Sequence, residues 1–428
     1  MSEDAAVELP GRDFSKVSRL SLGIGLAGLL VGLAGLIWGA SNGDNRPWMA
    51  WLFGFAFWMS VLVGMLLFIM ISHIFDAGWS VIIRRQLEHM VSAFPWMGLI
   101  FAPLILTPWL FPEYAGMIWK WLSPEYVLPG GGVVGDDPLY IWKQGWLDRF
   151  WMTFRTVLYF GVFIGLAFGL RKHSFALDSD GQERHVRQMR VLSAIGVFAV
   201  GLSATFGAFD WFMSLEYHWF STMFGVWFFA GAMRVAVAFT IVLCFVLSTK
   251  GWLAGIYKRA HRYDLGLLLL AFTVFWAYIA FSQMFLIYQA NIPEETFWYN
   301  LRLYASDGSY NDWWWVGMSL VVFHFLVPFL LLIFYTTKVS VKALLGVSVA
   351  ALVFHMVDLY YNILPAKVAD AADPSRYDVT GFGVSIFDLT ALIGMGGIVI
   401  WSFLRSARKA APIPLRDPRI LESIHHHE

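Results

Sequence analysis

Four ionisable side chains lie within long apolar segments, where their charges would be remote from water. Arg234 and His324 occupy two such segments, and His355 and Asp358 share a third. His355 and Asp358 are three residues apart, so they lie on one face of a helix. Ionisable groups at membrane depth are costly, and imidazole changes its charge near neutral pH. These residues therefore predict a proton relay; the alternative is a set of satisfied buried polar pairs.

Neighbouring polar residues could extend this relay. Tyr360 follows Asp358 toward the end of the same segment, and Asp388 lies early in the last apolar segment. A guanidinium stays protonated, so Arg234 is not expected to relay protons itself. It is instead expected to hold a carboxylate charged or to bias water electrostatically, unless it is a structural ion-pair partner.

Further charged residues lie near the ends of apolar segments. His73 and Asp76 are three residues apart and precede Arg84 and Arg85. They suggest either a site of proton uptake or an interfacial cluster of ion pairs. Arg155 lies one and a half turns inside its segment, where its side chain could reach the membrane surface.

The sequence offers few ligands for a metal or a redox centre. Cys244 is the only cysteine and lies in an apolar run, which excludes an intrachain disulfide and a CxxCH haem attachment. It also excludes a cysteine-ligated iron–sulfur cluster within this chain. The three consecutive histidines 425–427 are predicted to form a flexible tail, and no metal site is predicted.

The composition explains where these groups must lie. Hydrophobic residues make up 58% of the 428 residues, and only 14% are charged, against about 25% in ordinary soluble domains. So few charges could not cover so much apolar surface in water. The fold is therefore predicted to be an all-α integral membrane protein. The net charge of zero gives no reason to expect nucleic acid as a partner.

About ten stretches are long and apolar enough to cross a bilayer, which requires about 20 residues each. The third is the shortest and contains three prolines, whose kinks neighbouring helices can accommodate. The first is expected to be a retained helix, because its apolar stretch is long and its start is acidic. The predicted spans are 20–40, 48–72, 94–111, 150–170, 190–209, 221–247, 264–288, 313–335, 341–364 and 384–404.

The distribution of Lys and Arg predicts the orientation. With these spans, 21 basic residues lie on the side of the chain termini and 7 on the opposite side. Basic residues favour the cytoplasmic side, so both termini are expected in the cytoplasm. The chain is thus divided into a cytoplasmic segment 1–19, a membrane domain 20–405 and a tail 406–428, expected to extend into the cytoplasm. The long loops 112–149 and 289–312 suit the docking of extramembrane subunits.

One long motif resembles a known family. The run FDWFMSLEYHWFSTMFG at 209–225 resembles the ActF family, large membrane subunits of the bacterial alternative complex III. Supporting matches are DAGW at 76–79, which leads to Arg84 and Arg85, and RDPRILES at 416–423. The resemblance extends over nearly the whole chain.

The resemblance implies an NrfD/PsrC-like fold. Spans two to five and six to nine would form two four-helix bundles, approximately 48–209 and 221–364, with spans one and ten peripheral. It also implies a role in quinol oxidation with electron transfer to a cytochrome c type acceptor, in the bacterial inner (cytoplasmic) membrane. The partners would be an ActC-like paralogue, an iron–sulfur protein, and multihaem and monohaem cytochrome c subunits. Haem and iron–sulfur centres would belong to those subunits.

The function predicted for this chain follows from where its polar residues lie. The second bundle holds the richer set, which fits a proton-conducting or structural subunit better than the main catalytic one. A quinone, menaquinone or ubiquinone, is the one expected ligand. The alternatives are a membrane anchor without its own chemistry and, from another class, an ion-coupled transporter. The proton-path candidates are His73, Asp76, Arg234, His324, His355, Asp358, Tyr360 and Asp388; the quinone-binding candidates are Arg155, Asp210, Glu216 and His218.

Overall fold

The computed structural model describes residues 14–129, 131–369 and 377–427, and this part of the chain is almost entirely helical. Ten helical segments are long and apolar enough to cross a membrane, which confirms the predicted number. Seven of them are single helices: α1 (Ser15–Asn42), α2 (Arg46–Ile74), α6 (Arg149–Asp180), α8 (Phe224–Thr249), α9 (Arg259–Ala290), α14 (Val341–Ile363) and α15 (Ile386–Ala407). The fifth segment is mainly α7 (Glu183–Trp211).

The third and eighth segments are interrupted helices. The third covers residues 78–110 and comprises η1 (Gly78–Ser80), α3 (Val81–Met90), η2 (Val91–Ala93) and α4 (Phe94–Leu110). It therefore begins well before the predicted 94, because α3 carries charged residues that a search for apolar runs passes over. The eighth comprises α11 (Asp312–Ser319), the π-helix η7 (Leu320–Leu326) and α12 (Val327–Ile333).

Short elements connect the long helices. The helices among them are α5 (Pro138–Lys143), α10 (Pro293–Asn300), α13 (Tyr335–Val339) and α16 (Ile420–Ile424). Strands β1 (Lys367–Ala369) and β2 (Tyr377–Val379) pair antiparallel, with Val368 opposite Asp378. The remaining 3₁₀ turns are η3 (Pro112–Met117), η4 (Lys120–Leu122), η5 (Val134–Asp136) and η6 (Met213–Glu216).

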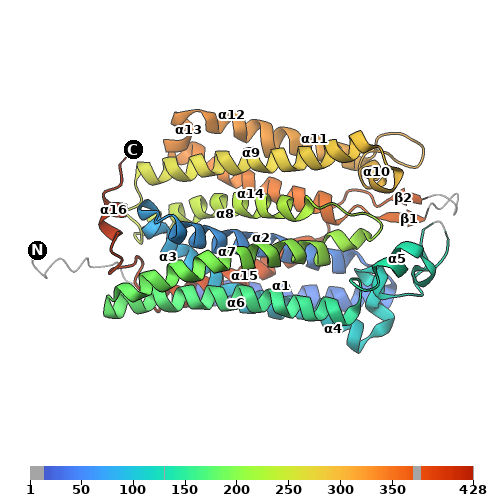
Figure 1. Cartoon of the computed structure of the whole chain (residues 1–428), viewed down its shortest axis with the longest axis horizontal. Coiled ribbons are helices and arrows are strands. Elements are labelled where there is room, and N and C mark those ends of the chain that lie inside the picture. Colours follow the sequence, from blue (N-terminus) through green and yellow to red (C-terminus); the bar gives the residue numbers. More distant parts are fainter. Residues whose placement is uncertain (1–13, 130, 370–376, 428) are drawn as a thin grey trace, which may run out of the picture.

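The long helices lie side by side in two groups (Figure 1). One group contains α2, α4, α6 and α7, and the other contains α8, α9, the α11–η7–α12 segment and α14. Helices α2 and α8 pack on each other where the groups meet, so α2 is enclosed on every side. Helices α1 and α15 pair with each other and lie against α2. This arrangement gives two four-helix bundles and a peripheral pair.

Small residues allow the closest helix contacts. A Cβ on Gly28 would lie 2.5 Å from the Cα of Gly394, so α1 and α15 approach at backbone distance. A Cβ on Gly64 of α2 would lie 2.0 Å from the carbonyl oxygen of Ala232 in α8. Close backbone approach through small residues is typical of helix packing in membranes. The glycines therefore set the spacing at both the peripheral pair and the contact between bundles.

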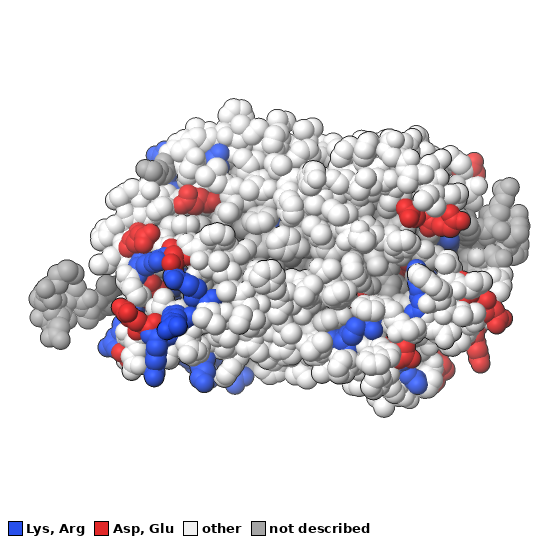
Figure 2. Space-filling model, viewed as in Figure 1, with Lys and Arg blue, Asp and Glu red and all other residues white. Residues whose placement is uncertain are grey.

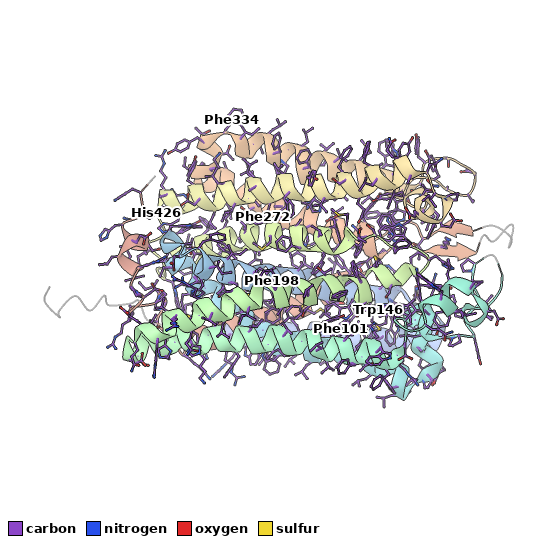
Figure 3. All side chains as sticks on the ribbon, in the orientation of Figure 1. Phe101, Trp146, Phe198, Phe272, Phe334 and His426 are labelled. Atoms are coloured by element: carbon purple, nitrogen blue, oxygen red, sulfur yellow. The ribbon has the colours of Figure 1, made fainter. Side chains whose placement is uncertain are left out.

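The surface has the polarity of a protein that spans a bilayer. Charged residues gather at the two ends of the molecule, and a broad uncharged belt lies between them (Figure 2). Large apolar side chains project from this belt; Phe198 is 74% exposed and Phe334 is 62% exposed (Figure 3). Such exposure is unfavourable in water and favourable in lipid. The chain is therefore a multi-pass membrane protein.

The two ends of the bundle differ in structure (Figure 1). The loop end holds α5, α10 and the β1–β2 hairpin, and the tail end holds α16. The tail does not extend freely as expected, because Ser423 accepts a hydrogen bond from the backbone N–H of Ile82 and donates one to the carbonyl of Trp79. His426 Nε2 also lies 2.6 Å from Asp264 Oδ2. These contacts hold the tail across the end of the bundles, which corrects the prediction for the tail and for His426, whereas His425 and His427 are exposed.

Candidate functional site

A buried arginine forms the centre of the second bundle. Arg234 of α8 is fully enclosed, and its Nε donates to Thr273 Oγ1 of α9 at 3.0 Å. Its Nη1 lies 2.9 Å from His324 Nδ1, and its Nη2 donates to the carbonyl oxygen of His324 at 2.8 Å. None of these three partners carries a negative charge that could balance the guanidinium. The guanidinium therefore places a fixed positive charge in the middle of the bundle, without a carboxylate in direct contact.

A helix irregularity makes the carbonyl of His324 available to Arg234. In a regular α-helix, this carbonyl would accept from the N–H of residue 328, which is a proline and has none. The π-helix η7 widens the turn at the same place. A buried carbonyl without a partner is costly, and Arg234 supplies the missing donor. Pro328 thus explains why the eighth segment is interrupted beside the site.

His355 of α14 lies between the two bundles with one ring nitrogen unused. The hydroxyl of Ser60, on α2, donates to the carbonyl of Phe57 at 2.7 Å, so its oxygen accepts from His355 Nε2 at 2.9 Å. The Nδ1 atom of His355 is buried and has no hydrogen-bond partner among the described residues. Gly231 leaves room for the ring, because a Cβ there would lie 3.0 Å from His355 Cε1. The free nitrogen is a buried proton acceptor.

Asp358 is held by neutral donors one turn further along α14. Trp276 Nε1 donates to Asp358 Oδ2 at 2.9 Å, and Asn362 Nδ2 donates to Oδ1 at 3.2 Å. The Trp276 ring also meets the His324 ring edge-on, with centroids 4.2 Å apart. Trp276 therefore links the carboxylate to the histidine beside Arg234. Only 2% of Asp358 is exposed to solvent.

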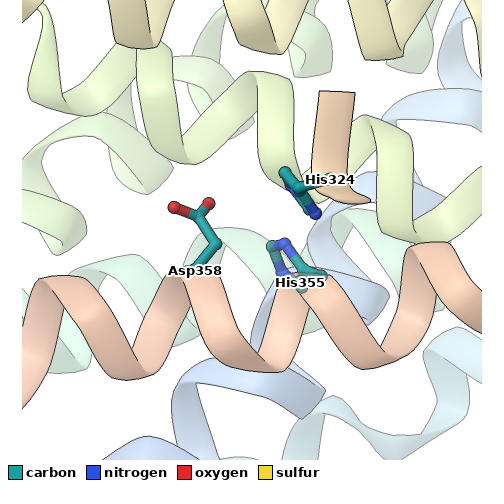
Figure 4. Close-up of side chains that lie close together, drawn as sticks. All are labelled: His324, His355 and Asp358. Atoms are coloured by element: carbon teal, nitrogen blue, oxygen red, sulfur yellow. The ribbon is translucent and has the colours of Figure 1, made fainter. Parts of the chain in front are cut away.

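The two histidines and the aspartate converge in the structure (Figure 4). Each offers an atom suitable for a proton or a metal, and these atoms lie within 4.8 Å of one another. A separation of this size is one that a single water molecule can bridge by hydrogen bonds. A divalent cation is disfavoured there, because the guanidinium of Arg234 already contacts His324. The arrangement suits proton transfer better than metal binding.

A cleft of about 530 Å³ opens beside Asp358, between α9, α10, α11, η7 and α14. Aromatic and aliphatic residues form most of its wall, while Asp358 and Asn362 contribute polar atoms. Tyr278 and Phe281, at its rim, are each more than 60% exposed on the apolar belt. The cleft therefore opens onto the apolar belt that faces the membrane.

The structure places Tyr360 and Asp388 in a separate cluster at the loop end. Arg46 forms an ion pair with Asp388 and donates to the Tyr360 hydroxyl. The single hydroxyl proton of Tyr360 can be donated to the carbonyl of Gly383 or to Asp388, whose Oδ2 lies 3.1 Å away. Asp388 also accepts from the N–H of Ser385 and so caps α15. No described hydrogen bond joins this cluster to Asp358, so these two residues do not extend the relay in the structure.

His73 and Asp76 lie at the tail end but do not pair with each other. Asp76 forms ion pairs with Arg190 and with Arg419 of the tail. Although partial burial acts in the opposite direction, hydrogen bonds from these two arginines hold the pKa of Asp76 below its usual value. The Nε2 atom of His73 is buried without a partner among the described residues. Asp76 therefore belongs to an interfacial cluster of ion pairs, which is one of the two roles that the sequence suggested for it.

Arg155 and Asp210 form a buried ion pair in the first bundle. The guanidinium donates to both carboxylate oxygens, at 2.8 and 2.9 Å, and its Nη2 also donates to the carbonyl of Trp146, in the loop before α6, at 3.0 Å, so the side chain does extend toward the loop end as predicted. Asp210 also accepts from Tyr159 and from Trp146, each at 2.8 Å. Four donors satisfy this carboxylate, which leaves it little capacity for a ligand.

Glu216 and His218 belong to another cluster, at the loop end. His218 Nδ1 lies 3.0 Å from Glu216 Oε1, and its Nε2 lies 2.5 Å from Asp137 Oδ2. Burial alone would lower the pKa of His218, but the two carboxylates outweigh this effect and raise it. The two carboxylates therefore favour the protonated form of His218. The cluster lines a second cleft of about 440 Å³ that also includes Lys120 and Lys367.

Sequence reasoning missed the uncharged partners of the central site. Ser60, Thr273, Trp276 and Asn362 are hydrogen-bond partners of the ionisable residues, yet each has the appearance of an ordinary membrane-helix residue in the sequence. Asn362 offers one weak signal, because it lies four residues after Asp358 on the same helix face. The others come from different helices, and no local pattern identifies them.

The fold and site define the chain as a multi-pass α-helical membrane protein with a buried cluster of ionisable residues. Comparisons with protein-family models and with curated proteins find no match.

Proposed function

We propose that this chain is a membrane subunit of a quinol:electron-acceptor oxidoreductase of the alternative complex III type, in which it provides a proton path. The 209–225 motif and the arrangement of two four-helix bundles with a peripheral pair support this proposal. The observation that carries the proton path is the convergence of His324, His355 and Asp358 beside the fixed charge of Arg234.

The chemistry of the cluster favours a short relay. Asp358 lies at the cleft and can accept a proton there, while the free Nδ1 of His355 offers the next acceptor toward α2. His324 is held by Arg234, whose charge opposes a second positive charge on that ring. A proton that arrives at Asp358 is thus expected to pass to His355 rather than to stay beside His324. Ser60 continues the route between the two bundles.

The proposal assigns the redox centres to partner subunits. The sequence supplies no cysteine pair for a cluster or a haem attachment, and the resemblance predicts partners that do. The excess of Lys and Arg at the tail end supports a cytoplasmic orientation of that end in a bacterial cell. The loop end, with α5, α10 and the hairpin, would then face the electron-carrying subunits on the opposite side of the cytoplasmic membrane.

A second candidate function is that of a membrane anchor. The saturated Arg155–Asp210 pair and the Arg46–Asp388 pair favour it, because both have the geometry of fixed structural contacts. The same interpretation would make Arg234 and Asp358 parts of the scaffold. It does not explain the unused acceptor on His355 or the cleft beside Asp358.

The test compares Asp358→Asn and Arg234→Leu with the wild type in the assembled complex, reconstituted in liposomes. Quinol oxidation and proton movement are measured together, with Asp312→Asn, an exposed residue in the first turn of α11, as the control. Normal turnover with lost proton movement would support the path. Loss of both activities in an intact complex would indicate that oxidation and proton transfer are tightly coupled at this site. Unchanged activity in both variants would exclude the path and favour the anchor.

A further inference from the structure

The cleft beside Asp358 has the chemistry of a binding site for a flat ring with a hydroxyl group. Its walls include the aromatic side chains of Trp227, Trp276 and Tyr299, which suit an aromatic or quinoid ring. A volume of about 530 Å³ lies within the roughly 300–1,000 Å³ common for small-molecule sites. The cleft can therefore hold a ring and the beginning of an apolar tail.

The route into the cleft favours a membrane-soluble molecule. Tyr278, Phe281 and Val321 at the rim are all more than half exposed on the apolar belt. Their exposed surfaces face lipid in the membrane, so a ligand with a long apolar tail can enter sideways between α9 and α11. The tail would remain in the bilayer while the ring moves toward α14.

The charge of the cleft selects among such molecules. Asp358 lines it, and its described lining contains no Lys or Arg. A phosphate headgroup would meet a carboxylate without a compensating cation, which is unfavourable. A neutral molecule that donates a hydroxyl hydrogen bond is favoured instead, because Asp358 has three donors, on Trp276, Trp227 and Asn362, and a carboxylate can accept about four hydrogen bonds.

We propose that this cleft binds a membrane quinol, with the ring between Trp276 and Tyr299 and one hydroxyl donating to Asp358. The choice of a quinol rests on the proposed function. The quinol would contact the proton path at Asp358. This contact also places the ligand in the second bundle. The quinone-binding residues expected from the sequence lie elsewhere, in the Arg155–Asp210 pair and the Glu216–His218 cluster.

The experiment uses the full chain in lipid nanodiscs with a photoreactive short-chain quinone, followed by mass spectrometry of the labelled peptides. Label is expected in residues 274–284 or 358–362, and unlabelled quinol is expected to compete with it. Ala280→Phe fills the cleft, and Asp358→Asn removes the charged acceptor without changing its size. Loss of a hydrogen bond to a charged group weakens binding by about tenfold, so Asp358→Asn should lose most of the label. Ala280→Phe should also lose most of it, because the larger side chain fills the cleft. Ala271→Phe, exposed on the same helix outside the cleft, is the matched control.

Two results would overturn the inference. One is label that persists in Ala280→Phe while that variant remains monodisperse. The other is label confined to other segments, with phospholipid as the only molecule recovered from the cleft. Failure of the proposed function has a different signature, namely normal proton movement in Asp358→Asn. In that event, labelling abolished by Ala280→Phe would still support a quinol site in the cleft.

Discussion

The contact of Gly64 with α8 connects helix packing to the central site, and Gly64→Ala tests this connection. A Cβ at Gly64 would lie 2.0 Å from the carbonyl oxygen of Ala232, and ordinary contact begins at 3.4 Å. The difference, 3.4 minus 2.0, requires a displacement of about 1.4 Å between α2 and α8. Both clashing groups belong to backbone or to its first carbon, so a change of side-chain rotamer cannot relieve the contact.

The displacement should reduce both stability and activity. Overpacking of this kind costs about 1–3 kcal/mol. Arg234 lies two residues after Ala232, and its hydrogen bonds to Thr273 and His324 span 2.8–3.0 Å. A shift of α8 by about 1 Å would break or lengthen them, and misplacements of that size can impair chemistry at a site severely. Proton movement in liposomes should therefore fall together with thermal stability.

The assay is the fraction of monodisperse protein that remains after heating in detergent, measured at one fixed heating protocol because unfolding of such proteins is often irreversible. Gly165→Ala is the control, since a Cβ at Gly165 meets nothing within 4 Å. Alanine is the better helix former by about 1 kcal/mol, so the control should be neutral or slightly more stable. If Gly64→Ala is as stable and as active as Gly165→Ala, the close contact between α2 and α8 does not position Arg234.

Two further perturbations address the clusters outside the central site. Asp210→Ala leaves Arg155 buried without its carboxylate and should cost about 3 kcal/mol; its thermal stability should lie below that of Arg155→Leu/Asp210→Leu, and equal stability would refute the pairing. His218 has a raised pKa, so its stabilising contribution is complete below its ordinary pKa of about 6.5 and is lost as the pH rises through the raised value. Thermal stability of the wild type should therefore fall more than that of His218→Gln between pH about 6 and 9, and parallel pH profiles would contradict this reasoning.

Much of the fold could be predicted because a bilayer imposes strong and local constraints on sequence. Each spanning helix needs a continuous apolar run, and nine predicted spans agree with the structure within several residues at their starts. The third span departs furthest, because Arg84, Arg85 and Glu88 of α3 interrupt the apolar pattern. Their mutual ion pairs and those with Asp178 and Asp417 satisfy these charges inside the protein. A hydropathy pattern does not show which residues distant in the chain form such ion pairs.

The docking of the C-terminal tail could not be predicted from the sequence either. Its polar, proline-containing sequence predicted an extended arm, yet Ser423 and Arg419 bind the end of the bundles. A short polar segment has no apolar periodicity that would predict its docking. The side-chain hydrogen-bond partners of Ser423 and Arg419 lie more than 300 residues away in the chain.

The sequence by itself determined the helical membrane fold, the number of spans and the identity of the ionisable residues at membrane depth. It also placed His355 and Asp358 on one face, because that relation is fixed by the helical repeat. Only the tertiary structure decided that Arg234 and His324 join them, that Tyr360 and Asp388 turn to Arg46 instead, and that a cleft opens beside Asp358. The physical reason is that helix rotation and spacing depend on contacts between segments, such as Gly64 with Ala232, and these contacts leave no local periodicity in the chain.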